Sequence, residues 1–464
     1  MPIAFPATYW SSAASTGFDP SQLSGLMLWL KSSAGVTTTS GVVTGWADQS
    51  GRGKDATAGT GYGPSVGYGL GGSYPSISFN GSTYMTGSQI WDGVQTYPDR
   101  EIIVFSRITD NTMPGPRGGT VERWAFADAH YNNGDFSVGR YSGSPLIRAQ
   151  NHTQLYTGSY PYNYFLASSS QVNNSNITFT TATGLNYVAT NSGGTFPVAP
   201  TGNYMVGKSP VYGNPWLGEI YEIMEFSRNL TTTERNQVFS YLQSTYNYDP
   251  HFSSVSILLH MDGTNGSTTL TDSSPNALAV TANGGAQIST AQSKFGGASA
   301  YFNGSSYATT ANSSLFNLTG DFTVEGWFYG VGLSTTTGTI IGKWQNPVAW
   351  TLTVGTTSIQ FGTGNSGSFI NTFTFSTTIS NGQWYHIAIT RSGSSLYCFL
   401  NGSQVGTTQT TTSNLSATST MDIGYLKSSN SNYFNGYIDD IRVTKGICRY
   451  TSNFTPPTSP FPNS

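Results

Sequence analysis

The chain repeats itself, and this repetition constrains its fold more than any other feature of the sequence. Three pairs of stretches match in the same order: WADQSG at 46–51 with LTDSSP at 270–275, SISFNGSTYMTG at 76–87 with SAYFNGSSYATT at 299–310, and GEIYEIMEF at 218–226 with GYIDDIRVT at 436–444. The offset between partners is nearly constant. Internal repeats are the sequence signature of tandem architectures. The sequence therefore predicts two copies of one domain.

Each copy reads as a series of short alternating strands separated by turn residues. Strands are expected over residues 102–106, 322–329, 384–390 and 396–400. One segment is typical of a helix, because Thr231 and Glu234 form a capping box before an apolar run. We predict an all-β chain with two tandem antiparallel β-sandwich domains, over 23–250 and 251–464, and one short helix near the end of the first.

Composition excludes several classes of protein. Charged residues make up 9% of the chain, against about 25% in typical soluble proteins, and aromatic residues make up 14%. Disordered and coiled-coil chains carry more charge and fewer aromatics. The net charge of −3 offers no basic surface for nucleic acid, and no apolar run reaches the roughly 20 residues that cross a bilayer. Two cysteines, Cys398 and Cys448, are too few for a disulfide scaffold, and we expect buried, reduced thiols.

The second copy resembles the laminin-G-like members of the concanavalin A-like jelly rolls, in the version common among bacteriophage virion proteins. The matching stretches are LLHMDGTNGSTTLTDSSPN, AQSKFGGASAYFNGSSY, GDFTVEGWFY, NGQWYHIAITRSGSSLYCFLNG and FNGYIDDIRVTKGICRYTSNFTPP, which lie within about residues 255–462. The resemblance implies a double-sheet jelly roll that serves binding or assembly, often of carbohydrate, and it implies no reaction. It also implies that the C-terminal tail closes over the domain.

The first copy looks like a divergent relative, from LMLWLKSSAGV, VTGWADQSGRGKDATA, ISFNGSTYM and GEIYEIMEFSRNLTTTERNQVFSYL, although residues 108–200 follow no pattern of the family. Residues 1–22 stand outside both repeats. Their aromatic residues Phe5, Tyr9, Trp10 and Phe18 could anchor the chain, so we predict a docking arm. The segment lacks the basic and apolar regions of a secretory signal, which favours assembly in the cytoplasm of a host.

Glycoside hydrolysis is the strongest enzymatic alternative, because laminarinase-type hydrolases share this jelly roll. Their acids follow an E-x-D-x-E pattern on one strand, and a retaining pair needs carboxyl groups about 5–5.5 Å apart. The nearest candidates are Glu219, Glu222 and Glu225. Strand alternation places Glu222 opposite the other two, which lie roughly 20 Å apart. Asp439 and Asp440 are adjacent and are expected on opposite faces, so we predict no enzymatic activity.

Acidic residues at equivalent positions of the two copies allow two interpretations. Asp48 and Asp272 each open a Ser- or Gly-rich turn, and Glu222 and Asp440 are equivalent on the last long strand. Related jelly rolls sometimes hold a structural calcium ion, which takes six to eight oxygen ligands. Asp48 with Glu222, or Asp262 with Asp272 and Asp440, could supply the carboxylates. The alternative, which we favour, is that Asp48 and Asp272 are Asx-turn residues that accept hydrogen bonds from their own backbone.

A sugar-binding site needs exposed aromatic rings beside hydrogen-bonding groups, because a ring face covers the C–H groups of the sugar and polar partners orient it. The densest aromatic cluster lies in LYTGSYPYNYF, within the divergent region. The sequence-predicted carbohydrate contacts are its tyrosines Tyr156, Tyr160, Tyr162 and Tyr164. Packing between copies or subunits is the alternative role. Trp344 and Trp350 are second candidates, but their alternation with apolar residues favours the core.

These observations predict a non-enzymatic structural protein of a bacteriophage virion: a surface decoration, an appendage or a tail-fibre component. Its lectin-like domains would bind host glycans by shape and hydrogen bonding. A capsid or tail cement protein that binds no sugar is the first alternative, and a laminarinase-type hydrolase is the second. The expected partners are other virion proteins, a host surface glycan and further copies of the chain, and the expected location is the virion.

Overall fold

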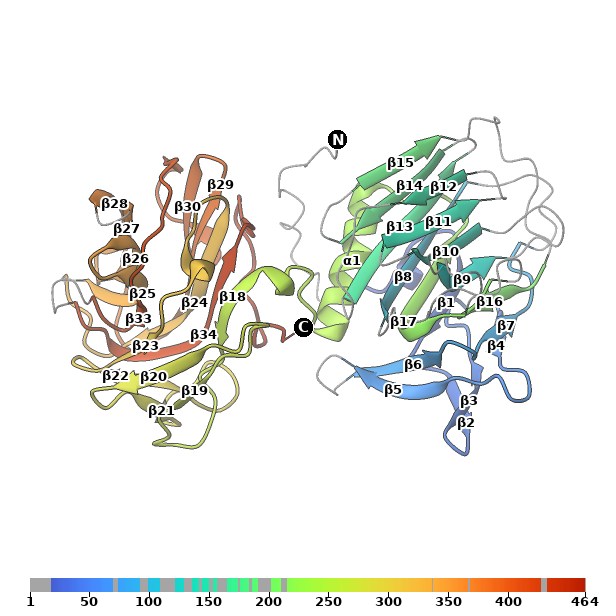
Figure 1. Cartoon of the computed structure of the whole chain (residues 1–464), viewed down its shortest axis with the longest axis horizontal. Coiled ribbons are helices and arrows are strands. Elements are labelled where there is room, and N and C mark those ends of the chain that lie inside the picture. The colour runs from blue at the N-terminus through green and yellow to red at the C-terminus, as the bar shows by residue number, and fades with distance from the viewer. Residues whose placement is uncertain are drawn as a thin grey trace. The chain divides into compact units, whose positions relative to one another are not determined.

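The structure is a computed structural model of the chain. It describes residues 18–463 except 70–73, 92–98, 109–121, 129–135, 142–143, 150–152, 157–164, 174–175, 183–185, 191–201, 210–214, 336, 366–367 and 427–431. Contacts within the chain define two compact units, of which the first ends at Pro250 and the second begins at His251 (Figure 1). The two units are described separately below as unit 1 and unit 2.

Unit 1 is built from short strands that pair antiparallel. They are β1 (Leu26–Lys31), β2 (Val36–Thr39), β3 (Val42–Trp46), β4 (Ala56–Thr57), β5 (Ser65–Gly69), β6 (Tyr74–Asn80), β7 (Met85–Gly87), β8 (Arg100–Ile108), β9 (Glu122–Asp128), β10 (Phe136–Tyr141), β11 (Ser144–Ala149), β12 (Thr153–Tyr156), β13 (Phe165–Asn173), β14 (Asn176–Thr181), β15 (Asn186–Thr190), β16 (Tyr204–Val206) and β17 (Leu217–Phe226). A short 3₁₀ turn, Pro20–Gln22, precedes them.

Strand β17 is central to the hydrogen-bonded network of unit 1. It pairs with β1, β6 and β8, and β8 pairs in turn with β13. A second series of pairs joins β7 to β16, β16 to β9 and β9 to β10. Buried side chains such as Leu30, Phe79, Val104, Phe126 and Ile220 form the core of the unit.

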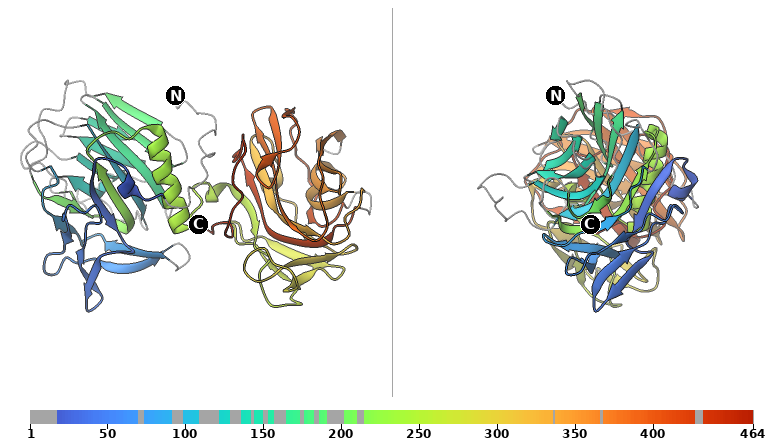
Figure 2. Two further views of the ribbon diagram at one scale, coloured as in Figure 1. Left: turned by 180° about the vertical axis from the view of Figure 1, so that it is seen from behind. Right: turned by 90° about the vertical axis from the view of Figure 1, so that its right-hand side faces the viewer.

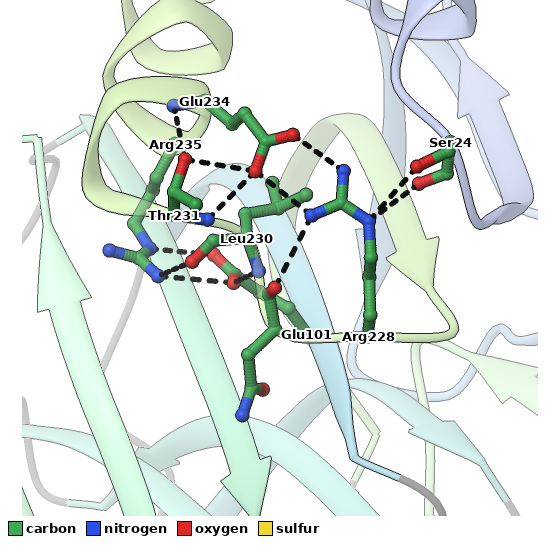
Figure 3. A network of polar contacts seen from close by, with 8 residues as sticks. Ser24, Glu101, Arg228, Leu230, Thr231, Glu234 and Arg235 are labelled. Atoms are coloured by element: carbon green, nitrogen blue, oxygen red, sulfur yellow. Dashed lines mark hydrogen bonds and ion pairs between the residues drawn. The ribbon is translucent and has the colours of Figure 1, made fainter.

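Helix α1 (Thr232–Tyr246) begins at the predicted capping box and covers one face of β1, β8 and β17 (Figure 2). The hydroxyl of Thr231 accepts the N–H of Glu234, whose carboxylate accepts the N–H of Thr231. Arg228 binds Glu234 at 2.6 Å, and Arg235 binds the buried Glu101 of β8 at 2.7 Å (Figure 3). Polar contacts thus fix the start of the helix, while its apolar side packs on the strands. In the described part of the chain, no helix is long and apolar enough to span a membrane.

Unit 2 contains a 3₁₀ turn at Phe252–Ser254, a second at Ser314–Phe316, and a further set of strands. The strands are β18 (Val255–Leu259), β19 (Thr269–Thr271), β20 (Ala279–Asn283), β21 (Gln287–Ser289), β22 (Ser299–Asn303), β23 (Tyr307–Thr310), β24 (Phe322–Gly330), β25 (Gly338–Trp344), β26 (Val348–Val354), β27 (Ser358–Asn365), β28 (Ser368–Ser376), β29 (Trp384–Ser392), β30 (Ser395–Leu400), β31 (Ser403–Gln404), β32 (Gln409–Thr410), β33 (Met421–Ile423) and β34 (Asn435–Lys445).

These strands form two antiparallel sheets that pack on each other. The first sheet has the order β21-β22-β34-β24-β29-β30-β31, with β18 also paired to β34 and β32 to β30. The second sheet has the order β19-β20-β23-β33-β25-β26-β27-β28 (Figure 1). Both sheets contribute to one apolar core, which includes Ile257, Phe302, Phe328, Trp350 and Phe361. The predicted all-β, jelly-roll class is confirmed.

Equivalent strands of the two units have the same register. Asn80 of β6 stands opposite Leu217 of β17, and Asn303 of β22 stands opposite Asn435 of β34. The pair β8–β17 corresponds in the same way to β24–β34, and β7–β16 corresponds to β23–β33. The second and third matches of the sequence repeat therefore fall on corresponding strand pairs in the two units.

A glycine ends the corresponding strands β16 and β33. Gly207 has φ +80° and Gly424 has φ +79°, in the left-handed region that favours glycine. A Cβ atom would lie 2.4 Å from the ring of Phe79 at Gly207, and 2.7 Å from the ring of Phe302 at Gly424. Both units thus bring a glycine backbone close to a core phenylalanine at the same place.

Candidate functional site

Four aromatic side chains form a row across the first sheet of unit 2. Tyr301 of β22 stands opposite Tyr437 of β34. Tyr437 stands opposite Tyr329 of β24, which in turn stands opposite Trp384 of β29. The centroids of successive rings are 5.0, 5.9 and 5.6 Å apart, within the range in which aromatic pairs attract one another. We call these four residues the aromatic row.

The aromatic row lies on the outer face of the sheet. Its four side chains are half-buried, whereas the adjacent strand residues Phe302, Phe328 and Ile438 lie in the core. Successive side chains of a strand point to opposite faces, so the row points away from the core. With strands about 4.8 Å apart, the row extends roughly 15 Å across the sheet. It is an extended, partly exposed aromatic surface.

Uncharged polar groups border the aromatic row. Gln287 of β21 stands opposite the first ring and is exposed, and Asn435 lies two residues before Tyr437, on the same face of β34. Ser289 lies two residues after Gln287 on the same face of β21, and it acts to lower the pKa of Tyr437. Burial raises the pKa of Tyr437, and the neighbouring phenols of Tyr301 and Tyr329 raise it further. These polar groups suit a ligand that is polar but uncharged. On the other side of the row, Asp439 lies buried two residues after Tyr437, and Lys294 lies 3.9 Å from the ring of Trp327.

Unit 1 has an ion pair where unit 2 has the aromatic row. The shared registers make Ser78, Glu219 and Arg107 equivalent to the first three members of the row. Arg107 Nη2 lies 2.9 Å from Glu219 Oε2. Two units with the same registers carry unlike side chains at this place, so the strand arrangement does not by itself require aromatic rings here.

A β-bulge changes the directions of the acids on β17. The register with β8 shifts between Ile220 and Glu222, so the expected strict alternation is wrong at this point. Glu219 and Glu222 both bind tyrosine hydroxyls of the cluster that α1 covers. Glu225 instead accepts a hydrogen bond from Trp91 in the other apolar cluster. The prediction that Glu219 and Glu225 share a face is therefore wrong.

Glu222 is enclosed by hydrogen-bond donors. The indole of Trp29 donates to Oε2 at 2.8 Å, and the hydroxyls of Tyr246 and Tyr241 donate to Oε1 at 2.9 and 3.0 Å. Burial raises its pKa to about 7, although these donors and Lys31 act against the shift. Because only 1% of the side chain is exposed, a glycosidic bond in solvent does not reach this carboxyl group.

Asp439 and Asp440 also lie at a bulge, and their predicted directions are wrong for the same reason. Ile438 and Ile441 on either side both belong to the core, so both aspartates point outward. Asp439 accepts two backbone N–H groups, at 2.7 and 3.1 Å. Asp440 lies 2.5 Å from His260 Nδ1 and accepts a backbone N–H from the C-terminal tail at 2.7 Å. Both acids are buried.

The C-terminal tail covers a buried charged network on the outer face of the first sheet. Glu325 lies 2.7 Å from Arg442, accepts the hydroxyl of Tyr450 at 2.9 Å and lies 3.5 Å from His386. Burial disfavours the charge, but Arg442 and His386 prevail and hold the pKa of Glu325 at about 2. Phe461 of the tail packs on the guanidinium of Arg442 at 3.8 Å. The tail closes over the domain, as the family resemblance implies.

The aspartates of the two turns accept equivalent sets of hydrogen bonds. Asp48 accepts the N–H groups two and six residues ahead, the hydroxyl two residues ahead, and the N–H of Trp29 on β1. Asp272 accepts the same set, with Leu258 of β18 in place of Trp29. The N–H two residues ahead is the contact of an Asx turn. The turn interpretation accounts for both residues.

The predicted calcium ligands do not fit a calcium ion. A cation needs oxygens whose lone pairs face it, whereas the carboxylates of Asp48, Asp272 and Glu222 face hydrogen-bond donors. Asp440 is bound by His260 and a backbone N–H, and Asp262 is exposed. Among the described residues, no group of three or more His, Cys, Asp or Glu side chains is placed to hold a metal ion.

The structure tests few of the aromatic candidates chosen from the sequence. Most of these candidates lie outside the described residues, namely Phe5, Tyr9, Trp10, Tyr160, Tyr162, Tyr164 and the side chain of Tyr156. Phe18 is described, and its ring lies edge-on to Tyr241 at 6.5 Å within a cluster of unit 1. Phe18 thus contacts unit 1, and its role in docking stays a prediction.

The remaining predictions concern buried positions. Trp350 lies in the core of unit 2, as expected. Trp344 does not: it is half-buried and packs edge-on against the exposed Phe369 at 6.2 Å, so its predicted core position is wrong. Cys398 and Cys448 are buried and unpaired, as predicted.

Sequence reasoning missed the aromatic row because its members lie far apart in the chain. Each is a single aromatic residue on a different strand, in SAYFN, GWFYG, GQWYH and NGYID. The signal was the outward position of one aromatic residue on each of these strands. Only the registers of β22, β34, β24 and β29 show that the four positions form one line.

Comparisons with known proteins give one family match and several distantly similar solved structures. Residues 302–447 match the model of a laminin-G family described as the concanavalin A-like lectin/glucanases superfamily. Similar solved structures include the LG4–5 domains of the mouse laminin α1 chain (12% identity, 79% of this chain and 86% of that one, TM-score 0.27). Another is domain 4 of AbnA, a GH43 extracellular arabinanase from Geobacillus stearothermophilus, in complex with arabinotriose (12%, 46% and 98%, 0.35).

A third is the binding domain of botulinum neurotoxin DC in complex with SialylT (11% identity, 92% of this chain and 96% of that one, TM-score 0.39). A search of curated proteins finds no match. The family match includes β24, β29 and β34 in full and begins within β22. The first three residues of β22, among them Tyr301, lie outside it. Over residues 302–447, unit 2 is similar to the concanavalin A-like lectins and glucanases.

Proposed function

We propose that this chain is a structural protein of a bacteriophage particle and that unit 2 binds carbohydrate at the aromatic row without cleaving it. The observation that carries the proposal is the row itself: half-buried, bordered by uncharged polar groups, and replaced by an ion pair in unit 1. Aromatic faces cover the C–H groups of sugars, and polar side chains at the border orient the hydroxyl groups. The family match supports a lectin-like role, and the sequence resemblance to virion proteins supports a place in a bacteriophage particle.

Binding without cleavage is proposed because the carboxyl groups near the aromatic row are buried and hydrogen-bonded. Glycoside hydrolysis needs two carboxyl groups on either side of the scissile bond, with a separation of about 5–10 Å. Glu325, Asp439 and Asp440 lie on the same face of the first sheet as the aromatic row, but each is buried and engaged in hydrogen bonds. We therefore propose that the row binds a sugar that is then released unchanged.

We also infer that the two units are copies of one domain, and that unit 2 kept or acquired the sugar site. The shared registers and the identical turns at Asp48 and Asp272 support this inference. Unit 1 and residues 1–22 would then attach the chain to the particle.

The test is glycan binding by the full chain, followed by calorimetry with an uncharged oligosaccharide that binds. Tyr437→Ala removes a central ring and should weaken binding about tenfold, which is about 1.4 kcal/mol. Tyr307→Ala is the control, because Tyr307 is a half-buried tyrosine of the second sheet, and this variant should bind like the wild type.

Three outcomes would contradict the proposal. Equal binding by Tyr437→Ala and the wild type would place the site elsewhere. Binding to no glycan, with particles that lose integrity when the protein is absent, would favour the cement alternative. Release of sugar from a polysaccharide by the purified chain would favour the hydrolase.

A further inference from the structure

Strand β28 is an unprotected edge of the second sheet. Within the described residues it pairs with β27 alone. Proteins usually protect an edge strand with charged residues or proline. β28 reads SFINTFTFS and has neither, and the wider segment from Trp344 to Thr390 contains no Asp, Glu, Lys or Arg. The edge therefore offers backbone hydrogen-bonding groups without the usual barrier to a second strand.

The outward backbone groups of β28 can be assigned from one hydrogen bond. The N–H of Thr377 donates to the carbonyl of Thr357, on the side of β27. Backbone N–H groups of a strand alternate between its two sides, so those of Thr374 and Ser376 point away from β27. The N–H of Thr372 is bound by the side chain of Asn371 at 2.8 Å. Thr374 and Ser376 are thus the donors open to a new strand.

The start of β28 exposes apolar side chains. Phe369 is 61% exposed and Ile370 is 46% exposed. The register with β27 shifts here, because Gly364 stands opposite Phe369 and Thr363 opposite Asn371, so Ile370 is the extra residue of a bulge. The regular part of the edge is therefore 371–376, with an exposed apolar pair at one end.

We propose that β28 pairs antiparallel with β28 of a second copy of this chain, so that the second sheets of two molecules become continuous. A second copy is the occupant that fits, because an antiparallel edge is self-complementary about a two-fold axis. The neutral edge also selects a neutral partner, since a charged strand would lose hydration here without an ion-pair partner. Phe369 and Ile370 would be covered at the ends of the paired segment. This inference goes beyond carbohydrate binding and does not depend on it.

The test is the molar mass of the full chain by light scattering and sedimentation. Thr374→Pro removes one outward N–H and leaves the ladder to β27 intact, because proline is tolerated where a strand N–H faces outward. Thr374→Ala keeps the N–H and is the matched control. We expect dimers for the wild type and Thr374→Ala, and at least tenfold weaker association for Thr374→Pro.

A charge at the same place gives a second, independent readout. Thr374→Lys would put like charges near each other in the paired edges, so it should weaken the dimer, and high salt should partly restore it. A wild-type monomer at high concentration would overturn the proposal. So would dimers of Thr374→Lys and Thr374→Pro that are as stable as the wild type, or assembly only with a different virion protein.

Discussion

Asp272→Asn separates the turn role of this residue from a calcium role. Oδ1 accepts the N–H groups of Leu258 and Ser274 at 3.0 and 2.9 Å, and Oδ2 accepts the N–H of Leu278 at 2.7 Å and the hydroxyl of Ser274 at 2.9 Å. An amide keeps one oxygen, so in either orientation its NH₂ group faces at least one backbone N–H. Hydrogen bonds to a charged group contribute about 1.5–3 kcal/mol each, so we expect a loss of about 3 kcal/mol.

The assay is thermal unfolding of the full chain, with the transitions of the two units followed separately. For a domain of 150–250 residues, 1 kcal/mol shifts the melting temperature by about 2–4 °C. Asp272→Asn should therefore lower the transition of unit 2 by about 6–12 °C. Asp48→Asn should lower that of unit 1 by a similar amount, because Asp48 accepts the same four hydrogen bonds.

Asp262→Asn is the control that discriminates between the two roles. Asp262 is exposed, and we named it as a calcium ligand together with Asp272. The turn role predicts that this variant and a chelator both leave the melting temperature unchanged. A calcium role predicts that the chelator and both variants lower it. A drop in chelator comparable to the effect of Asp272→Asn, or normal melting of Asp272→Asn, would refute our reasoning.

Three further predictions concern titration and thiol reactivity. The pKa of Glu222 is about 7 in the folded state, above its ordinary value of 4.5. The stability that Glu222 contributes is therefore fully present below pH 4.5 and is lost as pH rises through 7. In thermal melts between pH 5 and 8, the variant Glu222→Gln should show a smaller decline in melting temperature. The pKa of Glu325 shifts in the opposite direction, because its folded value of about 2 lies below 4.5. Glu325 therefore contributes about 3 kcal/mol of stability above pH 4.5, and this contribution is lost as pH falls toward 2. Thermal melts of unit 2 at acid pH would show the loss. Cys398 is fully buried, and burial raises its pKa, so a thiol reagent should label it only on unfolding; rapid labelling of the native chain would contradict this.

The features that the sequence predicted well depend on neighbouring residues. The capping box of Thr231 and Glu234 starts α1, because both partners lie within one helical turn. The turn at Asp48 and its equivalent at Asp272 are also local, since their main contacts reach only two and six residues along the chain. The matching stretches of sequence added long-range information, because they lie on strand pairs that have the same register in the two units.

The features that the sequence did not predict depend on register. Alternation assigned Glu222 and Asp440 to faces as if their strands were regular, but a bulge reverses the faces of the residues beyond it. A bulge arises from pairing with a distant strand, and the residues of β17 alone do not show it. The aromatic row was missed for the same reason, since it exists only when four separate strands are aligned.

The bulged acid binds a different covering segment in each unit. Glu222 accepts hydroxyls of α1, and the equivalent Asp440 accepts a backbone N–H of the C-terminal tail, so in each unit this carboxylate anchors the segment that follows the last strand and covers the same face of the sheet. Because one unit is covered by a helix and the other by an extended tail, the covered areas need not be equal. In unit 2 the covering segment leaves the aromatic row half-exposed. The covering segment and a few outward side chains thus decide which surface each unit exposes, while the registers that hold the sheets together stay the same.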